Sequence, residues 1–238
     1  MWDPVALANE VATLDVVSGG RAVLGVGAGH TPREWTSTGR PYPSPGARVE
    51  RMVELIEATQ ALLRGEPVSH RGKHFTLVDA VLADPRPVRD RVPLMVGGNG
   101  TRLLRFAAQH AEVVGITGLG RTLADGHRHE VNWSPPGLDR IIEIVRSAAE
   151  ASGCRPQIEA LVQHVEVTDD APAAAARLTV HVPGASVEDL LSAPFVWIGT
   201  VEEIREKLHE HRISLGVDRY MVRAPAVSQV RDIIMTTP

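Results

Sequence analysis

The sequence predicts an α/β protein in which short apolar strands alternate with amphipathic helices. Residues 22–26 form a continuous apolar run, which is typical of a strand buried on both faces of a parallel sheet. Strand, loop and helix signals then repeat along the chain, and no internal repeat, linker or low-complexity tract interrupts them. These observations favour one domain over residues 1–238, with right-handed crossovers and a parallel sheet that is open or closed into a barrel.

In residues 3–96 the sequence pattern predicts helices, two strands and a hairpin insertion. Asp3 and Pro4 form a good cap and first turn for a helix that ends at Ser18-Gly19-Gly20. The strand at 22–26 leads into a proline-rich loop that runs to Pro45, where a second long helix begins. Residues 68–77, centred on Arg71-Gly72-Lys73, predict a surface hairpin before the strand at 94–96.

The second part continues the alternation. We expect a helix from Thr101, a strand at 112–116, a polar loop over 117–136, a helix at 138–151 and a strand at 158–167. Two helical pieces and a short apolar run at 195–198 follow. Thr200 and Glu203 form a capping box that opens a helix, and a strand at 217–222 and a last helix finish the pattern. The principal strands begin at five positions: Ala22, Leu94, Glu112, Ile158 and Val217.

Composition excludes several classes of partner. Hydrophobic residues make up 43% of the chain and charged residues 23%, as in soluble globular proteins. A net charge of −4 gives no electrostatic reason to expect nucleic acid or an anionic membrane as a partner. No apolar run has the length of a membrane span. Cys154 is the only cysteine, so no internal disulfide forms, and a cytoplasmic location fits best.

A glycine-rich turn joins the strand at 94–96 to the next helix. It consists of Gly97, Gly98, Asn99 and Gly100, and the helix begins at Thr101 without a spacer. Glycines let a ligand approach the backbone, and a helix start offers unpaired N–H groups at the positive end of its dipole. This arrangement suits a phosphate. A tight turn without a ligand explains the residues equally well.

A second glycine-rich segment, at 25–29, superficially resembles a dinucleotide fingerprint. That fingerprint requires a helix that starts within the glycines, and the prolines from Pro32 onward prevent one. Gly27 and Gly29 instead suggest close approach of a flat ligand or of a neighbouring backbone.

Five segments together resemble the bacterial luciferase-like monooxygenase superfamily, in particular its actinobacterial branch of F420-dependent oxidoreductases. They are LDVVSGGR (14–21), LGVGAG (24–29), VGGNG (96–100), ITGLGRTLADG (116–126) and LVQHVEV (161–167). The resemblance implies a TIM barrel, usually dimeric, that binds F420 or, alternatively, reduced FMN at the C-terminal ends of its strands. It implies that Gly97, Gly98, Asn99, Gly100 and Thr101 hold the cofactor phosphate. The implied reaction is hydride transfer to a small organic substrate, or its monooxygenation if the cofactor is FMN.

The count of strands departs from this family. A closed (β/α)8 barrel has eight strands, and the first helix here matches the family's third barrel helix. We therefore expect a partial barrel that lacks the first three strands, with its apolar surface covered by self-association into a homodimer. The alternative is a degenerate, non-catalytic member of the same fold that binds flavin or only a partner chain.

Candidate chemistry comes from the strand ends that are present. His30 follows Gly29 at the end of the first strand and is the candidate catalytic residue for proton transfer, although an ordinary loop histidine is an open alternative. Arg121 follows the third strand and would pair with a phosphate or the acidic tail of F420, unless it is simply solvated. His127 and His129 match no zinc spacing, so no metal is expected. Gln163 and His164 are expected on opposite faces of one strand.

Overall fold

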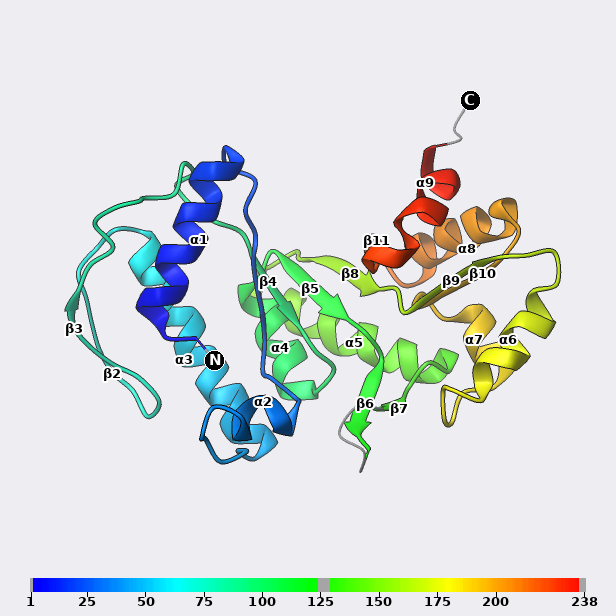
Figure 1. Ribbon diagram of the computed structural model, residues 1–238, viewed down its shortest axis with the longest axis horizontal. Coiled ribbons are helices and arrows are strands. Elements are labelled where there is room, and N and C mark those ends of the chain that lie inside the picture. Colours follow the sequence, from blue (N-terminus) through cyan, green and yellow to red (C-terminus); the bar gives the residue numbers. More distant parts are fainter. Residues whose placement is uncertain (1, 124–128, 236–238) are drawn as a thin grey trace. The chain divides into compact units, whose positions relative to one another are not determined.

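The computed structural model describes residues 2–123 and 129–235 of the chain. These residues belong to two compact units, Met1–Val96 and Gly97–Pro238, which are described separately below. Figure 1 shows helices and strands in both, so the predicted α/β class is confirmed. The prediction of one domain over residues 1–238 stays a prediction. No helix in the described part of the chain has the length and apolar character that crossing a bilayer requires.

The first unit contains the predicted helices, strands and hairpin. In chain order its elements are α1 (Pro4–Ser18), β1 (Leu24–Gly27), α2 (Pro32–Thr36), α3 (Pro45–Leu63), β2 (Val68–Arg71), β3 (Thr76–Ala80) and β4 (Leu94–Gly97). Asp3 caps α1 through the N–H groups of Val5 and Ala6, and Gly19 ends the helix in the left-handed conformation with φ of 64°. Both predicted boundaries of this helix are confirmed.

Small residues let α1 and α3 approach each other closely. Ala8 and Ala12 of α1 are fully buried and share one apolar cluster with Ala58 and Leu62 of α3. Beside them, β1 and β4 are neighbours in the sheet, and the N–H of Leu24 donates to the carbonyl of Pro93 at 2.9 Å.

Burial of the first strand on both faces is a prediction that the structure contradicts. Leu24 is buried, but Val23 is 44% exposed and Val26 is only half-buried. Strand pairing begins at Leu24 rather than at residue 22. The apolar run therefore presents only alternate residues to the core, as expected for a strand that is covered on one face.

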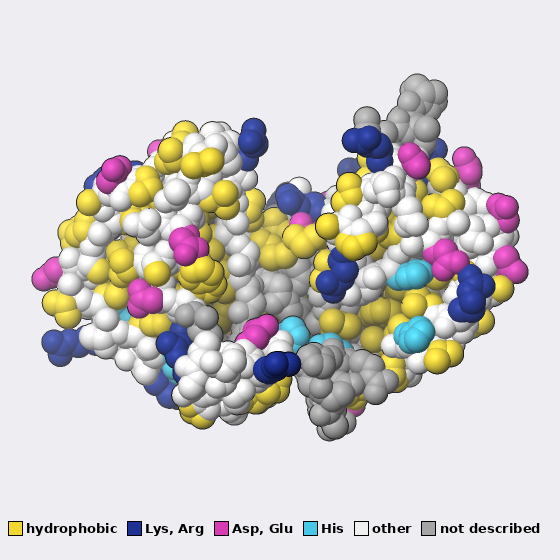
Figure 2. Space-filling model, viewed as in Figure 1, with side chains coloured by type: hydrophobic (Ala, Val, Ile, Leu, Met, Phe, Trp, Pro, Cys, Tyr) yellow, Lys and Arg dark blue, Asp and Glu magenta, His cyan; other side chains and the backbone are white. Residues whose placement is uncertain are grey.

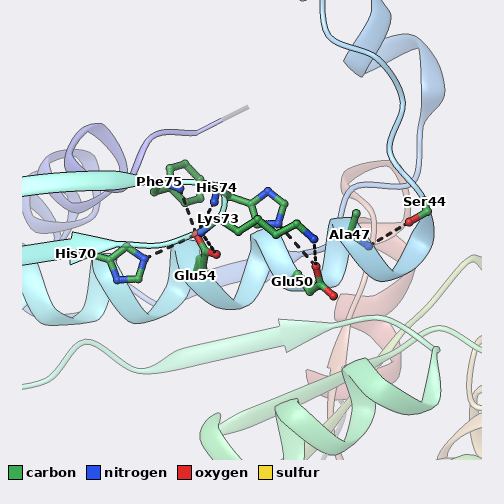
Figure 3. A network of polar contacts seen from close by, with 8 residues as sticks. All are labelled: Ser44, Ala47, Glu50, Glu54, His70, Lys73, His74 and Phe75. Atoms are coloured by element: carbon green, nitrogen blue, oxygen red, sulfur yellow. Dashed lines mark hydrogen bonds and ion pairs between the residues drawn. The ribbon is translucent and has the colours of Figure 1, made fainter.

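A carboxylate on α3 anchors the β2–β3 hairpin. Glu54 Oε1 accepts a hydrogen bond from the N–H of Lys73 at 2.8 Å, and Oε2 accepts from the N–H groups of His74 at 2.8 Å and Phe75 at 3.1 Å. Figure 3 shows the Glu54 carboxylate beneath this turn, with Lys73 also reaching Glu50 at 3.0 Å. Burial acts to raise the pKa of Glu54, but these three N–H donors hold it below its ordinary value.

Replacing Glu54 by glutamine should detach this turn from α3. The amide cannot accept from all three N–H groups, because its own NH₂ group is a donor that faces them. We expect a loss of about 1.5–3 kcal/mol in the free energy of unfolding, measured with urea at pH 7. Glu57→Gln is the matched control, since Glu57 lies exposed on the same helix and should change stability by less than about 0.5 kcal/mol. Equal effects of the two substitutions would refute the anchoring role.

The second unit contains the remaining strands and helices. They are α4 (Thr101–His110), β5 (Val113–Ile116), β6 (Leu119–Thr122), β7 (His129–Val131), α5 (Pro135–Ser152), β8 (Gln157–Leu161), β9 (His164–Val167), α6 (Ala171–Thr179), α7 (Val187–Ser192), β10 (Val196–Gly199), α8 (Val201–Ser214), β11 (Val217–Met221), a short 3₁₀ turn (Ala224–Ala226) and α9 (Val227–Met235). The capping box predicted at Thr200 and Glu203 is present at the start of α8.

Parallel strands form the sheet of this unit. β8 is central, with β5 on one side and β11 on the other, and both pair with it in parallel. β9 and β10 form a separate parallel pair. All four residues of β5 are buried, which is typical of a strand covered on both faces. α4 packs against α5 and covers β5.

The single strand predicted at 158–167 is wrong, because the chain changes partners in the middle of this run. The N–H of Val162 still donates to the carbonyl of Met221 at 2.8 Å, whereas the N–H of Gln163 donates to the carbonyl of Phe195 at 2.8 Å. β8 therefore ends beside β11 and β9 begins beside β10. Apolar and polar residues are mixed in both halves, so hydropathy alone could not reveal the switch. Gln163 lies between the strands, and the expectation that it shares one strand with His164 is also wrong.

The predicted polar loop at 117–136 contains a short antiparallel hairpin. β6 pairs with β7, and Leu119 lies opposite Val131 in the register. Residues 124–128 between these strands lie outside the described part of the chain. The strands are only four and three residues long, and their sequence is mostly polar or glycine, which explains why a loop was predicted.

Candidate functional site

The glycine-rich turn between β4 and α4 exposes backbone rather than side chains. Gly98 has φ of +157°, and an added Cβ would lie 2.8 Å from Leu103 Cδ1. The N–H of Gly98 donates to the carbonyl of Gly115 at 3.0 Å, which fixes the turn to β5. At Gly100, by contrast, an added Cβ would meet no atom within 4 Å. The turn is therefore closed on its Leu103 side and open at Gly100.

The start of α4 is electrostatically suited to an anion. Gly100 is the N-cap and has no side chain with which to occupy the first N–H groups of the helix. The first turn contains no acidic residue and includes the exposed Arg102. Helix N-termini carry a partial positive charge, which here is not neutralised by a carboxylate in that turn. An exposed anion, such as a phosphate, is the ligand that this arrangement favours.

Asn99 uses both ends of its amide within the protein. Its Nδ2 donates to Thr117 Oγ1 at 2.6 Å, and its Oδ1 accepts from the N–H of Thr117 at 3.2 Å. A backbone N–H can only donate, which assigns the orientation of this amide. Thr117 Oγ1 also accepts from the N–H of Leu119 at 3.3 Å. Asn99 thus connects the turn after β4 to the first residue after β5.

Two aromatic residues support Thr117 and Gly118 from beneath. Trp133 Nε1 donates to the carbonyl of Thr117 at 3.0 Å, and the Trp133 and Phe195 ring centroids are 5.6 Å apart. Gly118 has φ of +61°, and an added Cβ would lie 2.5 Å from Trp133 Cδ1 and 2.6 Å from Phe195 Cε2. Only glycine fits here. Sequence reasoning missed Thr117 and Trp133, although Thr117 directly follows an apolar strand, just as the glycine turn does.

The other predicted site residues lie elsewhere or outside the description. Gly27, Gly29 and His30 belong to the first unit, at the end of β1. His30 is exposed, and its carbonyl accepts from Tyr42 Oη at 2.8 Å. An added Cβ on Gly29 would lie 3.5 Å from Trp35 Nε1, so an indole covers that glycine. The side chain of Arg121 lies outside the described residues. The structure tests none of these assignments.

The polar residues near 164 are engaged in side-chain contacts of their own. His164 Nε2 lies 3.3 Å from Glu166 Oε2, and Arg177 Nη2 donates to Glu166 Oε1 at 2.6 Å. Gln163 Oε1 accepts from Arg223 Nη2 at 2.9 Å. Among the described residues no three histidine, cysteine or acidic side chains are placed to hold a metal ion, and His127 lies outside them.

The second unit also has a cavity of about 790 Å³ that includes none of the predicted site residues. His211 forms part of its wall and donates from Nε2 to the carbonyl of Ser192 at 2.8 Å, which leaves Nδ1 to accept from Tyr220 Oη at 3.4 Å. Burial lowers the pKa of His211 and raises that of Tyr220. Both groups are therefore neutral at pH 7, and their contacts are those of a packed core.

Taken together, a parallel α/β sheet and an anion-favouring glycine turn at a strand's C-terminal end are features of α/β proteins that bind phosphate-bearing ligands. Residues 1–219 match the family of luciferase-like monooxygenases, and the chain belongs to that family.

Its curated relatives include F420-dependent enzymes. The F420-dependent glucose-6-phosphate dehydrogenase of Amycolatopsis mediterranei (strain U-32) is 29% identical over 151 residues, which are 63% of this chain and 41% of that protein. The enzyme of the same name from Microbacterium testaceum (strain StLB037) is 36% identical over 111 residues, 47% of this chain and 32% of that protein. The matched segments thus span 41% and 32% of these two relatives.

Solved structures support the same fold. An F420-dependent secondary alcohol dehydrogenase in complex with an F420-acetone adduct aligns with a TM-score of 0.72 at 20% identity, covering 93% of this chain and 69% of that chain. The EDTA monooxygenase from Chelativorans sp. BNC1 aligns with a TM-score of 0.72 at 16% identity, covering 99% and 72%. The chain therefore has an α/β fold with a parallel sheet that matches luciferase-like TIM-barrel structures over most of its length.

Proposed function

We propose that this chain binds F420, or alternatively FMN, through the glycine turn at the start of α4, as part of an oxidoreductase that acts on a small organic substrate. The observation that carries the proposal is the start of α4, where the N-cap Gly100 has no side chain to occupy the first N–H groups and the first turn contains no acidic residue, in a chain whose relatives include F420-dependent enzymes. The cofactor would supply the redox chemistry, namely hydride transfer or, with FMN, monooxygenation.

The residues of the turn fit a phosphate group. Gly98 and Gly100 add no side chain, and space beyond Gly100 is open. The backbone N–H groups of the first turn of α4 would donate to the phosphate, and Arg102 adds positive charge. Thr101 would add its hydroxyl as a donor. These residues would bind and orient the cofactor, and they do not themselves transfer a proton.

We propose a partial (β/α)8 barrel in which the strands of this chain correspond to the later barrel strands of longer relatives. His30 remains the candidate for proton transfer, supported by its exposed position three residues beyond the end of β1.

Self-association as a homodimer is proposed on the apolar surface of the first unit. Apolar side chains reach the visible face of that unit in several places (Figure 2). The helix α1 buries one face against α3 and yet carries exposed apolar residues on its other side: Val5, Leu14, Val16 and Val17. A helix that is apolar on most sides is normally covered on most sides.

Replacing Gly100 by aspartate separates phosphate binding from folding. The new Cβ meets no atom within 4 Å, and aspartate is a good N-cap, so stability should stay within a few tenths of a kcal/mol or rise. The carboxylate would occupy the first N–H groups of α4 and repel a phosphate. We expect the dissociation constants of FMN and F420, measured by fluorescence titration, to rise by roughly tenfold or more, which corresponds to about 1.4 kcal/mol.

Gly100→Asn is the matched control, because asparagine caps the helix in the same shape without the charge. It should weaken cofactor binding less than aspartate does. If a folded Gly100→Asp variant binds both cofactors as tightly as the parent chain, the phosphate is not bound at this turn.

A further inference from the structure

Two hydrogen bonds between Asn99 and Thr117 tie the candidate phosphate turn to the residue that follows β5. Asn99 is the only residue of the segment 97–100 that has a side chain, and both ends of its amide are bonded to Thr117. Nδ2 keeps one further N–H and Oδ1 one further lone pair, but the two bonds to Thr117 fix the position and orientation of the amide. The contacts therefore support a role in holding the turn in place.

Thr117 is itself held on each of its polar groups. Its N–H donates to Asn99, its hydroxyl oxygen accepts from Asn99 and Leu119, and its carbonyl accepts from Trp133 Nε1 at 3.0 Å. Trp133 is only 3% exposed and packs against the fully buried Phe195. The position of Asn99 is thus fixed to the core of the second unit through two consecutive side chains.

These hydrogen bonds matter because the other three residues of the turn are glycines. Glycine loses more conformational freedom on ordering than any other residue, so an unsupported turn would have to be ordered by the ligand itself. A turn that is ordered in advance binds its ligand more tightly, since that entropy loss has already occurred on folding.

We propose that Asn99 is a positioning residue which, through Thr117 and Trp133, holds the Gly98–Gly100 backbone in the conformation that binds the cofactor phosphate. This inference rests on the proposed function. It refines the prediction that Asn99 binds the cofactor, and it assigns Thr117 and Trp133 a part in affinity for the phosphate alone.

The test compares ligands with and without the phosphate. FMN and riboflavin share one ring system, and only FMN carries a phosphate. F420 and its phosphate-free deazaflavin form the second pair. Thr117→Val has almost the same shape as threonine and removes the hydroxyl that receives Asn99, whereas Thr117→Ser keeps the hydroxyl and is the conservative rescue. Dissociation constants for all four ligands would be measured on the full chain by fluorescence titration.

The expected result is a loss confined to the phosphate-bearing ligands. Thr117→Val should raise the dissociation constants of FMN and F420 by roughly tenfold and change those of the phosphate-free ligands by less than about twofold. Thr117→Ser should bind all four ligands like the parent chain. Unchanged FMN and F420 binding by Thr117→Val overturns the positioning role. Equal losses for ligands with and without phosphate also overturn it, because they indicate general damage.

Two further outcomes keep the test decisive. A parent chain that binds FMN no more tightly than riboflavin, and F420 no more tightly than its phosphate-free form, would refute the phosphate turn and with it the proposed function. If Thr117→Val fails to fold by circular dichroism, Trp133→Phe replaces it, since phenylalanine keeps an aromatic ring and lacks the Nε1 donor. That variant should show the same phosphate-specific loss at about threefold, and no loss would overturn the proposal.

Discussion

Replacing Asp15 by asparagine is expected to destabilise the first unit by about 3–5 kcal/mol, toward the lower end because its partner Arg89 is one-third exposed. Asp15 is fully buried, and its Oδ1 accepts from Arg89 Nη2 at 2.8 Å and Nε at 3.2 Å. Its Oδ2 accepts from the N–H of Val88 at 2.9 Å. Asparagine would leave the guanidinium without its counter-charge and turn an NH₂ group toward N–H donors.

The same carboxylate predicts a dependence of stability on pH. Burial acts to raise the pKa of Asp15, but the hydrogen bonds and charge of Arg89, with the N–H of Val88, hold it below its ordinary value. A group whose folded pKa lies below the unfolded value stabilises the fold at higher pH. This contribution should be lost as the pH falls below about 4 and through the folded pKa.

Urea unfolding of the parent chain and the Asp15→Asn variant, at pH 7 and at pH 3, measures both effects. The difference between the two proteins should be large at pH 7 and smaller at pH 3, where Asp15 is already largely protonated in the unfolded chain. The exposed Asp90 is the control, and Asp90→Asn should change stability by less than about 0.5 kcal/mol. A difference that does not shrink in acid would contradict the ion-pair explanation.

Replacing Trp133 by alanine should destabilise the second unit by about 3–5 kcal/mol, because it empties a buried aromatic site beneath Gly118. Trp133→Phe should lose only about 0.5–1.5 kcal/mol, the contribution of one hydrogen bond to the carbonyl of Thr117. Calorimetry or urea unfolding would separate the two substitutions. The control is Trp2→Ala, since Trp2 is 48% exposed. If Trp2→Ala lowered the free energy of unfolding as much as Trp133→Ala does, the buried indole would have no special role.

Local signals in the sequence predicted much of the fold. The caps at Asp3 and at Thr200 with Glu203 act within a few residues, so their patterns could be recognised without tertiary structure. The glycine turn at 97–100 was recognised for the same reason. The exchange of partners at Gln163 was not predictable, because it depends on the distant residues Met221 and Phe195.

The candidate site shows the same division between local and distant causes. The absence of side chains at Gly98 and Gly100 follows from their residue type. The hydrogen bonds that hold Asn99 in place depend on Thr117, eighteen residues away, and on Trp133, which follows the β6–β7 hairpin. The residues that can approach a ligand are therefore easier to identify from a sequence pattern than the residues that hold them in place.

The central claim is that a cofactor phosphate binds the backbone at the start of α4. Its most direct test is a titration of the ¹⁵N-labelled chain with FMN and F420, followed through the backbone amide signals by two-dimensional NMR. The account predicts that the amides of Gly98, Gly100 and the first turn of α4 shift most, and that the phosphate-free ligands leave them unchanged. Shifts that are confined to other residues, or that appear equally with riboflavin, would contradict it.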